Sequence, residues 1–310
     1  LKHRKGSFEA AVHCAASISF DDRQSDSIWA TNLGGTRHFA QVVRDLSIPR
    51  VHAVSTAYVA GDAPRFSETD LEIGQRSRNA YEASKKAAEE LLIASLGDCL
   101  QIIRPSIVVG HSDSGQIHAF EGFYNAPRAL HRIVDGLATK SILPEGIRRQ
   151  DGRIVMPLTL RVDAAARLNL VPINWVVDVM ASLIDVGQTG KCCHLTHDSP
   201  IGIDEVVATV SQHFAVAGLR AEDVPQARRS REVDLLQRRL DAALRAYRPY
   251  LMSDTVFTGN TAARLLGARY MPPPRIDSAM VQKLLEFATS VNWRRPGNRK
   301  PPETNLAACA

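Results

Sequence analysis

The fold of this chain is decided by two neighbouring stretches, VHAVSTAYVAGD at residues 51–62 and NAYEASK at residues 79–85. The first is an apolar strand pattern that ends in two hydroxyl residues, Ser55 and Thr56. The second places Tyr81 and Lys85 four residues apart, in a segment whose Ala, Glu and Lys content favours a helix. Residues at i and i+4 lie on one face of a helix, one turn apart. We therefore predict a tyrosine–lysine pair close to a strand end that carries hydroxyl groups.

Such a pair has a chemical use. An ammonium beside a phenol favours the phenolate, so the sequence predicts a Tyr81 pKa lowered from about 10 toward neutral pH. That phenol can donate and accept the proton of a carbonyl/alcohol pair. Tyr58 is a weaker candidate, because Asp62 rather than a lysine lies four residues on. The plainer alternative is a tyrosine and a lysine that merely share a helix surface.

Further motifs accompany this pair in a fixed order. HCAA at residues 13–16 follows an apolar strand pattern, NLGGT at 32–36 lies within a helical pattern over 25–46, and RPSIVVG at 104–110 continues a strand. Strand and helix patterns alternate through residues 9–110, which predicts parallel β-α-β winding. Because glycine is a poor helix former, we expect Gly34 and Gly35 to pack closely against the sheet.

In this order and spacing, the motifs HxAA, NxxGT, STAYVxG, YxxSK and RPSIVVG resemble the extended short-chain dehydrogenase/reductase superfamily. Their wording is most similar to its thioester-reductase and fatty-acyl-reductase branch, whose NAD(P)-binding domain is also called male-sterility-like. The resemblance covers most of residues 8–215. It implies an α/β fold, a Rossmann-like doubly wound parallel sheet with a smaller C-terminal substrate lobe.

The domain organisation follows from the resemblance and from composition. Residues 1–215 are expected to form the NAD(P)-binding domain, with substrate-lobe insertions around 111–175. Residues 216–293 are expected to form a mainly helical substrate lobe, and the polar, proline-rich residues 294–310 a disordered tail.

One family feature does not occur in this sequence, the G-x-x-G-x-x-G turn that holds the cofactor pyrophosphate at a helix N-terminus. We therefore expect a chain truncated at its N-terminus, lacking the first β-α-β portion and the residue that selects NAD or NADP. Such a chain is expected to bind the nicotinamide cofactor poorly by itself.

The resemblance implies catalytic roles for four residues. Tyr81 would be the general acid in reduction and the general base in oxidation, and Lys85 would also hydrogen-bond the nicotinamide ribose. Thr56 would hold the substrate oxygen, with Ser55 as the alternative because strand neighbours point to opposite faces. Asn32 would be either a proton-relay residue or a structural pin between its helix and a neighbouring strand.

Cofactor contacts are implied in the same way. Ala15 and Ala16 are expected on the adenosine side of the cofactor, and Pro105 and Ser106 on the nicotinamide side, together with Tyr81 and Lys85. The expected cofactor is NADP, with NAD as the alternative.

The implied activity is the NAD(P)H-dependent reduction of a long-chain acyl thioester or aldehyde, free or bound to a carrier. Two alternatives stay open. One is a hydroxysteroid-like or nucleotide-sugar dehydrogenase or epimerase of the same superfamily, and the other is an inactive fragment or binding protein. A Ser-His-Asp hydrolase is disfavoured, because no G-x-S-x-G nucleophile elbow occurs.

The composition of the chain favours some classes of binding partner and cellular location over others. The net charge of +5 is compatible with phosphorylated cofactors or an acidic acyl carrier protein. Aromatic content of 6% without a concentrated basic stripe argues against nucleic-acid binding. Five irregularly spaced cysteines favour a reducing cytoplasm over a disulfide framework. No apolar run approaches about 18 residues, so no membrane span is expected.

Two segments invite other interpretations. The run CCHLTH at 192–197 contains metal-ligand types, but alternate strand residues face opposite sides and no second cluster exists, so no metal site is expected. Residues 226–248 show an arginine-rich amphipathic helix pattern. This helix could present a solvated basic face, a docking face for an acidic carrier protein or phosphopantetheine, or a membrane-surface face.

Overall fold

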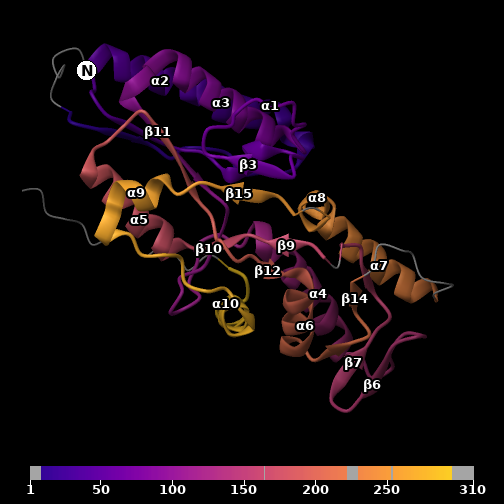
Figure 1. Ribbon diagram of the computed structural model, residues 1–310. Helices are drawn as coiled ribbons and strands as arrows, with labels where there is room; N and C mark the ends of the chain where they lie inside the picture. The colour runs from indigo at the N-terminus through magenta and orange to yellow at the C-terminus, as the bar shows by residue number, and fades with distance from the viewer. Residues whose placement is uncertain (1–7, 164, 222–229, 253, 295–310) are drawn as a thin grey trace, which may run out of the picture.

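The computed structural model describes residues 8–163, 165–221, 230–252 and 254–294 (Figure 1). Its centre is a four-stranded sheet in the order β1 (Ala11–His13), β2 (Val51–Val54), β4 (Leu100–Pro105) and β11 (Lys191–Leu195). Every pairing in this sheet is parallel, which confirms the predicted α/β fold with a parallel central sheet.

Helices cover both faces of the sheet, as doubly wound topology requires. On one face α2 (Gly35–Leu46) and α3 (Ala80–Leu96) share a core with β2 and β4, in which Ala53 and Ile102 take part. On the other face α5 (Ile173–Val186) and α9 (Thr261–Leu266) pack against Ile103 and Cys193. Ile102 and Ile103 separate in this way because strand neighbours alternate between faces.

The predicted helix over residues 25–46 is continuous but not uniform. It begins with α1 (Ser25–Trp29), passes through a π-helical turn (Ala30–Gly34) and continues as α2. A Cβ atom added at Gly34 or Gly35 would meet nothing within 4 Å. The expected close packing of these glycines against the sheet is therefore wrong, and they lie instead at the junction of the π-helical turn and α2.

A second unit, which we call the lobe, lies beside the sheet at the lower right of Figure 1. It contains a large apolar core, separate from the two cores on the sheet faces. Its helices are α4 (Asn125–Ala138), α6 (Ile203–His213), α7 (Arg231–Leu244), α8 (Arg248–Leu251) and α10 (Ser278–Ser290). Its strands are β6 (Arg148–Gln150), β7 (Arg153–Val155), β8 (Thr159–Leu160), β9 (Arg167–Leu168), β12 (Ile201–Gly202), β13 (Val216–Ala217) and β14 (Arg220–Ala221). Two parallel strands, β5 (Ile107–Val109) and β10 (Leu170–Pro172), join it to the sheet.

The chain returns from the lobe to the sheet near its end. Strand β15 (Val256–Thr258) pairs in parallel with β3 (Arg65–Ser67), and α9 packs against α5 and β11. The buried carboxylate of Glu68 fixes this return, because it accepts hydrogen bonds from the backbone N–H groups of His194 and Thr261. The chain therefore does not stay in the lobe over 216–293 as expected, and α10 enters the lobe again. Of the expected tail, residues 295–310 lie outside the described residues.

Candidate active site

A cavity of about 820 Å³ begins at the carboxyl edge of the sheet and extends into the lobe. Parallel α/β sheets bind ligands at this edge, where the strand ends meet. Thr56, Tyr81, Pro105 and Ser106 all line the cavity, together with Ser55. The structure thus brings together four of the residues singled out from the sequence.

Tyr81 lies in the first turn of α3 and its side chain is buried. It makes a side-chain hydrogen bond with Thr56, whose hydroxyl also accepts a bond from the Tyr58 backbone N–H at 3.2 Å. Burial raises the pKa of Tyr81 to about 12, and the bond with Thr56 opposes this only in part. The phenol is therefore protonated at neutral pH, contrary to the lowered pKa predicted from the Tyr81–Lys85 spacing.

Lys85 explains the difference. Its Nζ atom donates to the carbonyl oxygen of Val54 at 2.8 Å, at the end of β2, and Lys85 does not line the cavity. Burial lowers the pKa of Lys85, with Glu89 acting in the opposite direction. Its charge influences the pKa values of His13 and Cys14 near the end of β1. The ammonium therefore lies between the ends of β1 and β2, bound to the Val54 carbonyl, and burial rather than this ammonium dominates the pKa shift of Tyr81.

Asn32 acts as a pin in the structure. Its amide accepts from the Ser17 backbone N–H at 2.7 Å and donates to the Ser17 carbonyl and to the Ser84 hydroxyl. Ser84 in turn donates to the carbonyl of Tyr81 at 2.9 Å. Asn32 does not line the cavity. These contacts favour the structural interpretation of Asn32 over the proton relay, and they fix the segment after β1 relative to α3.

Ala15 and Ala16 lie in that same pinned segment. Ala15 is exposed and Ala16 is half-buried, and neither lines the cavity. Their assignment to the adenosine side of a cofactor stays a prediction.

Two buried hydroxyls at the strand ends test whether the site suits a polar ligand. The Oγ atoms of Ser55 and Ser106 have no hydrogen-bond partner among the described residues, and both residues line the cavity. Buried polar groups are nearly always hydrogen-bonded, so two such hydroxyls beside Thr56 and Tyr81 fit a ligand with polar atoms. The sequence predicts Thr56 or, as the alternative, Ser55 at the site, yet both residues line the cavity, because β2 ends at Val54 and the strand alternation stops there.

Sequence reasoning missed a cluster of aromatic rings at the same cavity. The ring of Phe20 lies 5.2 Å from Tyr81, 5.2 Å from Tyr247 and 5.1 Å from Tyr250. Tyr58 meets Tyr250 edge-on at 5.1 Å. The members come from three distant parts of the chain, so no local pattern predicts that their rings meet. Among the lobe members, only Tyr247 lies on a pattern that the sequence shows, the amphipathic helix over 226–248.

Beyond the rings, the cavity is lined mainly by aliphatic side chains of the lobe. They come from α4, α6 and α7, from the segments between them and from the loop before α4: Ile117, Ala126, Leu130, Leu160, Val162, Leu168, Val206, Val207, Val210, Leu219, Leu240 and Leu244. Six polar residues outside the ends of β2 and β4 also line the cavity: His111, Gln116, His118, Glu121, Asn174 and Asp178. The site is therefore polar at the sheet edge and mainly, but not wholly, apolar along the rest of its length.

A model of the NAD-binding family described as male sterility protein matches residues 2–180 of the chain. The chain belongs to this family. No curated protein sequence matches it at a significant level. Among the described residues, no helix has the length and apolar character to span a membrane, and no group of three or more possible metal ligands occurs.

Solved structures show the same fold. The terminal R domain from the myxalamid PKS-NRPS biosynthetic pathway aligns over 95% of this chain and 71% of its own, with a TM-score of 0.71 and 19% identity. A thiolation-reductase di-domain from an archaeal non-ribosomal peptide synthetase aligns over 92% and 58%, with a TM-score of 0.63 and 13% identity. UDP-glucuronic acid 4-epimerase from Bacillus cereus, in complex with NAD, aligns over 91% and 75%, with a TM-score of 0.59 and 12% identity. The chain thus has the fold of NAD(P)-binding reductases and epimerases.

Proposed function

We propose that this protein is an NAD(P)H-dependent reductase of long-chain acyl thioesters or the corresponding aldehydes. The observation that carries the proposal is the cavity of about 820 Å³, which joins the hydroxyls of Thr56 and Tyr81 to a long aliphatic wall. Burial of an alkyl chain gains about 0.8 kcal/mol per methylene, so such a wall suits an acyl tail. A sugar or nucleotide-sugar substrate would instead need hydrogen-bonding groups along the whole cavity, whereas the aliphatic lining residues outnumber polar ones such as Gln116, His118 and Glu121.

The residues at the sheet edge suit this chemistry. A bound nicotinamide supplies the hydride. Tyr81 is protonated at neutral pH and donates its proton to the substrate oxygen as negative charge develops there. An aldehyde then becomes the alcohol, whereas a thioester becomes a hemithioacetal, which releases the carrier thiol and leaves the aldehyde. Thr56 holds that oxygen through its hydroxyl, as an oxyanion-hole donor does.

The cofactor would lie along the strand ends. Pro105 and Ser106 would flank the nicotinamide, and the Ser106 hydroxyl, which has no partner among the described residues, would offer it a hydrogen bond. Lys85 holds the ribose from the gap between β1 and β2, and Ala15 and Ala16 lie toward the adenosine. NADP is the proposed cofactor, with NAD as the alternative.

An arginine-lined hollow supports a phosphorylated or acidic carrier for the substrate. Helix α7 buries Leu240 and Leu244, as its amphipathic pattern predicted. A hollow of about 420 Å³ shares Leu244 with the main cavity, and its other lining residues are Arg161, Arg238, Asp241, Ala242, Arg245 and Arg248. A guanidinium group can donate two parallel hydrogen bonds to two oxygens of one phosphate. This hollow therefore suits the phosphate of phosphopantetheine or CoA, although Asp241 also lines it. Residues 226–229 of the predicted helix lie outside the described residues.

The test is a substrate panel with both cofactors. Binding of NADPH and NADH to the chain is first titrated by fluorescence, up to millimolar concentrations because no glycine-rich pyrophosphate turn occurs in the sequence. Oxidation of NADPH or NADH is then followed with acyl-CoA of different lengths, long-chain aldehydes, a steroid ketone and a UDP-sugar. We expect turnover with the acyl substrates, faster for longer chains. Turnover of the sugar or steroid alone would move the protein to another substrate class, and no turnover with saturating cofactor would make it a binding protein.

A further inference from the structure

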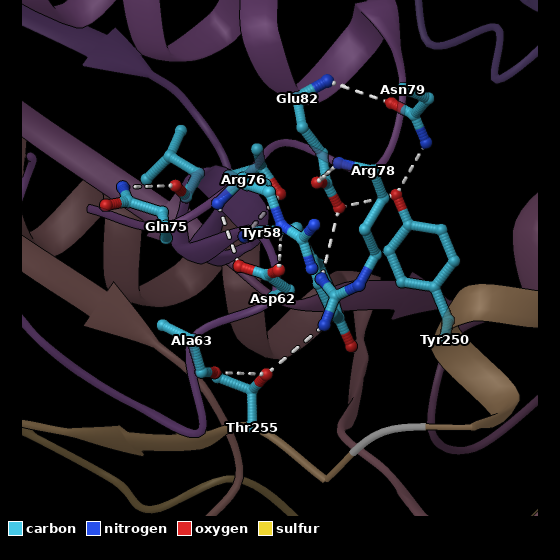
Figure 2. Close-up of polar contacts among 12 residues, drawn as sticks. Tyr58, Asp62, Ala63, Gln75, Arg76, Arg78, Asn79, Glu82, Tyr250 and Thr255 are labelled. Carbon is cyan, nitrogen blue, oxygen red and sulfur yellow. Dashed lines mark hydrogen bonds and ion pairs between the residues drawn. The ribbon is translucent and has the colours of Figure 1, made fainter. Parts of the chain in front are cut away.

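A tyrosine of the lobe, Tyr250, hydrogen-bonds the helix turn that carries Tyr81 (Figure 2). The hydroxyl of Tyr250, from α8, donates to Oε1 of Glu82 at 2.6 Å and accepts from Nδ2 of Asn79 at 2.8 Å. Asn79 is the N-cap of α3 and Glu82 ends its first turn, so the two partners of Tyr250 flank Tyr81 in sequence. The Tyr250 hydroxyl thus contacts α3 on both sides of the proposed proton donor.

Glu82 makes this contact more than an ordinary surface bond. The Glu82 side chain is 0% exposed, and its carboxylate also accepts from the Arg78 backbone N–H at 2.7 Å and pairs with the Arg78 guanidinium at 3.3 Å. Its own backbone N–H donates to Oδ1 of Asn79 at 3.0 Å. Helix N-termini leave backbone N–H groups without internal partners, and such caps decide where the first turn lies. A buried carboxylate that loses a donor is costly, so Glu82 holds Tyr250 tightly.

Ring contacts carry the same connection toward the reacting group. The Tyr250 ring stacks on Phe20 at 5.1 Å, and Phe20 also contacts the Tyr81 ring at 5.2 Å. The Arg78 guanidinium lies over the Tyr250 ring, 5.1 Å from its centroid. Both the backbone and the ring of Tyr81 are therefore linked to Tyr250, the backbone through the caps and the ring through Phe20.

We propose that Tyr250 is a positioning residue, through which the docked lobe sets the place of the Tyr81 hydroxyl. The inference rests on the proposed role of Tyr81 as proton donor. General acid catalysis depends on hydrogen-bond geometry, and a displacement of about 1 Å can cost about a hundredfold in rate. When α8 is docked, the first turn of α3 is held and Tyr81 meets Thr56. When α8 moves away, Glu82 loses a donor, Asn79 loses an acceptor and the turn loosens.

The decisive variant is Tyr250→Phe, which keeps the ring in the cavity wall and removes only the hydroxyl. We expect kcat to fall about 10- to 100-fold, while KM for an apolar substrate and the Kd of NADPH change less than about threefold. A residue that merely lined the cavity would affect KM instead. Glu82→Gln keeps an acceptor for Tyr250 but places an amide N–H₂ opposite the Arg78 backbone N–H, so it should loosen the same turn and lower kcat as well.

The matched control is Tyr124→Phe. Tyr124 is a fully buried tyrosine of the lobe, whose hydroxyl accepts from the Gly110 backbone N–H at 2.9 Å and which does not line the cavity. Loss of the Tyr124 hydroxyl also leaves a buried partner without its hydrogen bond and so lowers stability, but this hydroxyl makes no hydrogen bond to α3. We expect a lowered melting temperature with kcat within about threefold of wild type.

The outcomes separate the two proposals. An equal fall of kcat in Tyr124→Phe and Tyr250→Phe would mean general softening of the lobe and would overturn the positioning role. A Tyr250→Phe enzyme with wild-type kcat would do the same. If Tyr81→Phe itself retains wild-type kcat, the proposed role of Tyr81 fails first. A loss in Tyr81→Phe without a loss in Tyr250→Phe would overturn only the inference about Tyr250.

Discussion

The two ends of the cavity are built in opposite ways. At the sheet edge, a few polar side chains that lie between residues 54 and 106 meet where parallel strands end. In the lobe, many aliphatic side chains from residues 117–251 form a wall in which no single one stands out. The edge can therefore be damaged by the loss of one atom, whereas the wall should respond gradually to changes of volume. In the proposed enzyme, the sheet edge would carry out the chemical step and the aliphatic wall would select the substrate by its chain length.

The largest effect should come from the edge, in Tyr81→Phe. The ring and its contact with Phe20 stay, but the transferable proton is lost. We expect kcat to fall by about 10²–10⁴-fold with little change in NADPH affinity, as is typical for the loss of a general acid. Steady-state kinetics and a fluorescence titration measure both, and Tyr270→Phe, outside the cavity lining, is the control. Near-wild-type turnover in Tyr81→Phe would contradict the assignment of Tyr81 as the proton donor at the sheet edge.

Lys85→Met comes next. The substitution keeps a long side chain in a buried position but removes the bond to the Val54 carbonyl and the proposed contact with the ribose. Both kcat and cofactor affinity should fall, by about tenfold or more each, since a charge-assisted hydrogen bond is worth about 1.5–3 kcal/mol. Lys86→Met is the matched control, because Lys86 pairs with Glu72 at the surface, and it should change either quantity less than about threefold. Equal effects of the two variants would indicate that Tyr81 and Lys85 merely share a helix surface and that Lys85 has no role in catalysis or cofactor binding.

The wall should give a smaller and more selective response. Val206 lines the cavity from α6, and Val206→Phe should displace about two methylenes of a long chain. At about 0.8 kcal/mol each, kcat/KM should fall about tenfold for a 16-carbon substrate and stay within about threefold for a 6-carbon one. Ala208→Phe, at an exposed position of the same helix, is the control. A uniform loss at every chain length would contradict the assignment of the wall to the acyl tail.

The smallest effect is expected from pH. Reduction needs protonated Tyr81, and a pKa raised to about 12 keeps that form almost fully populated at pH values well below 12. With saturating cofactor and substrate, kcat for reduction should therefore vary less than about twofold between pH 6 and pH 9. A rate that falls above about pH 8 would indicate the lowered pKa that the sequence alone predicts.

The sequence predicted the edge well and the wall poorly, for physical reasons. Thr56, Tyr81, Pro105 and Ser106 could be placed together, because strand ends of a parallel sheet meet at one edge whatever the loops do. The pKa of Tyr81 could not be predicted, since it depends on burial rather than on spacing.

The lobe contacts lay further out of reach. The division at residue 215 failed for β15 and α9, because the buried Glu68 that fixes them is nearly 200 positions away from Thr261 in sequence. Tyr250 carried no local signal at all. Its hydroxyl is used by Asn79 and Glu82, which are 171 and 168 residues away.

These long separations also bear on how the protein is made. The ends of the chain segment that joins Thr261 to Glu68 are 193 residues apart, and the strand pair β3–β15 closes a loop of similar length. Contacts so distant in sequence form late in folding, because loop closure must precede any gain from them. During synthesis, the sheet from β1 to β4 can form while Tyr250 and Thr261 are still untranslated. A ribosome-bound intermediate would thus contain Tyr81 before Tyr250 can bind Asn79 and Glu82. The apolar lining of the incomplete cavity would then be exposed to chaperones that bind apolar surface.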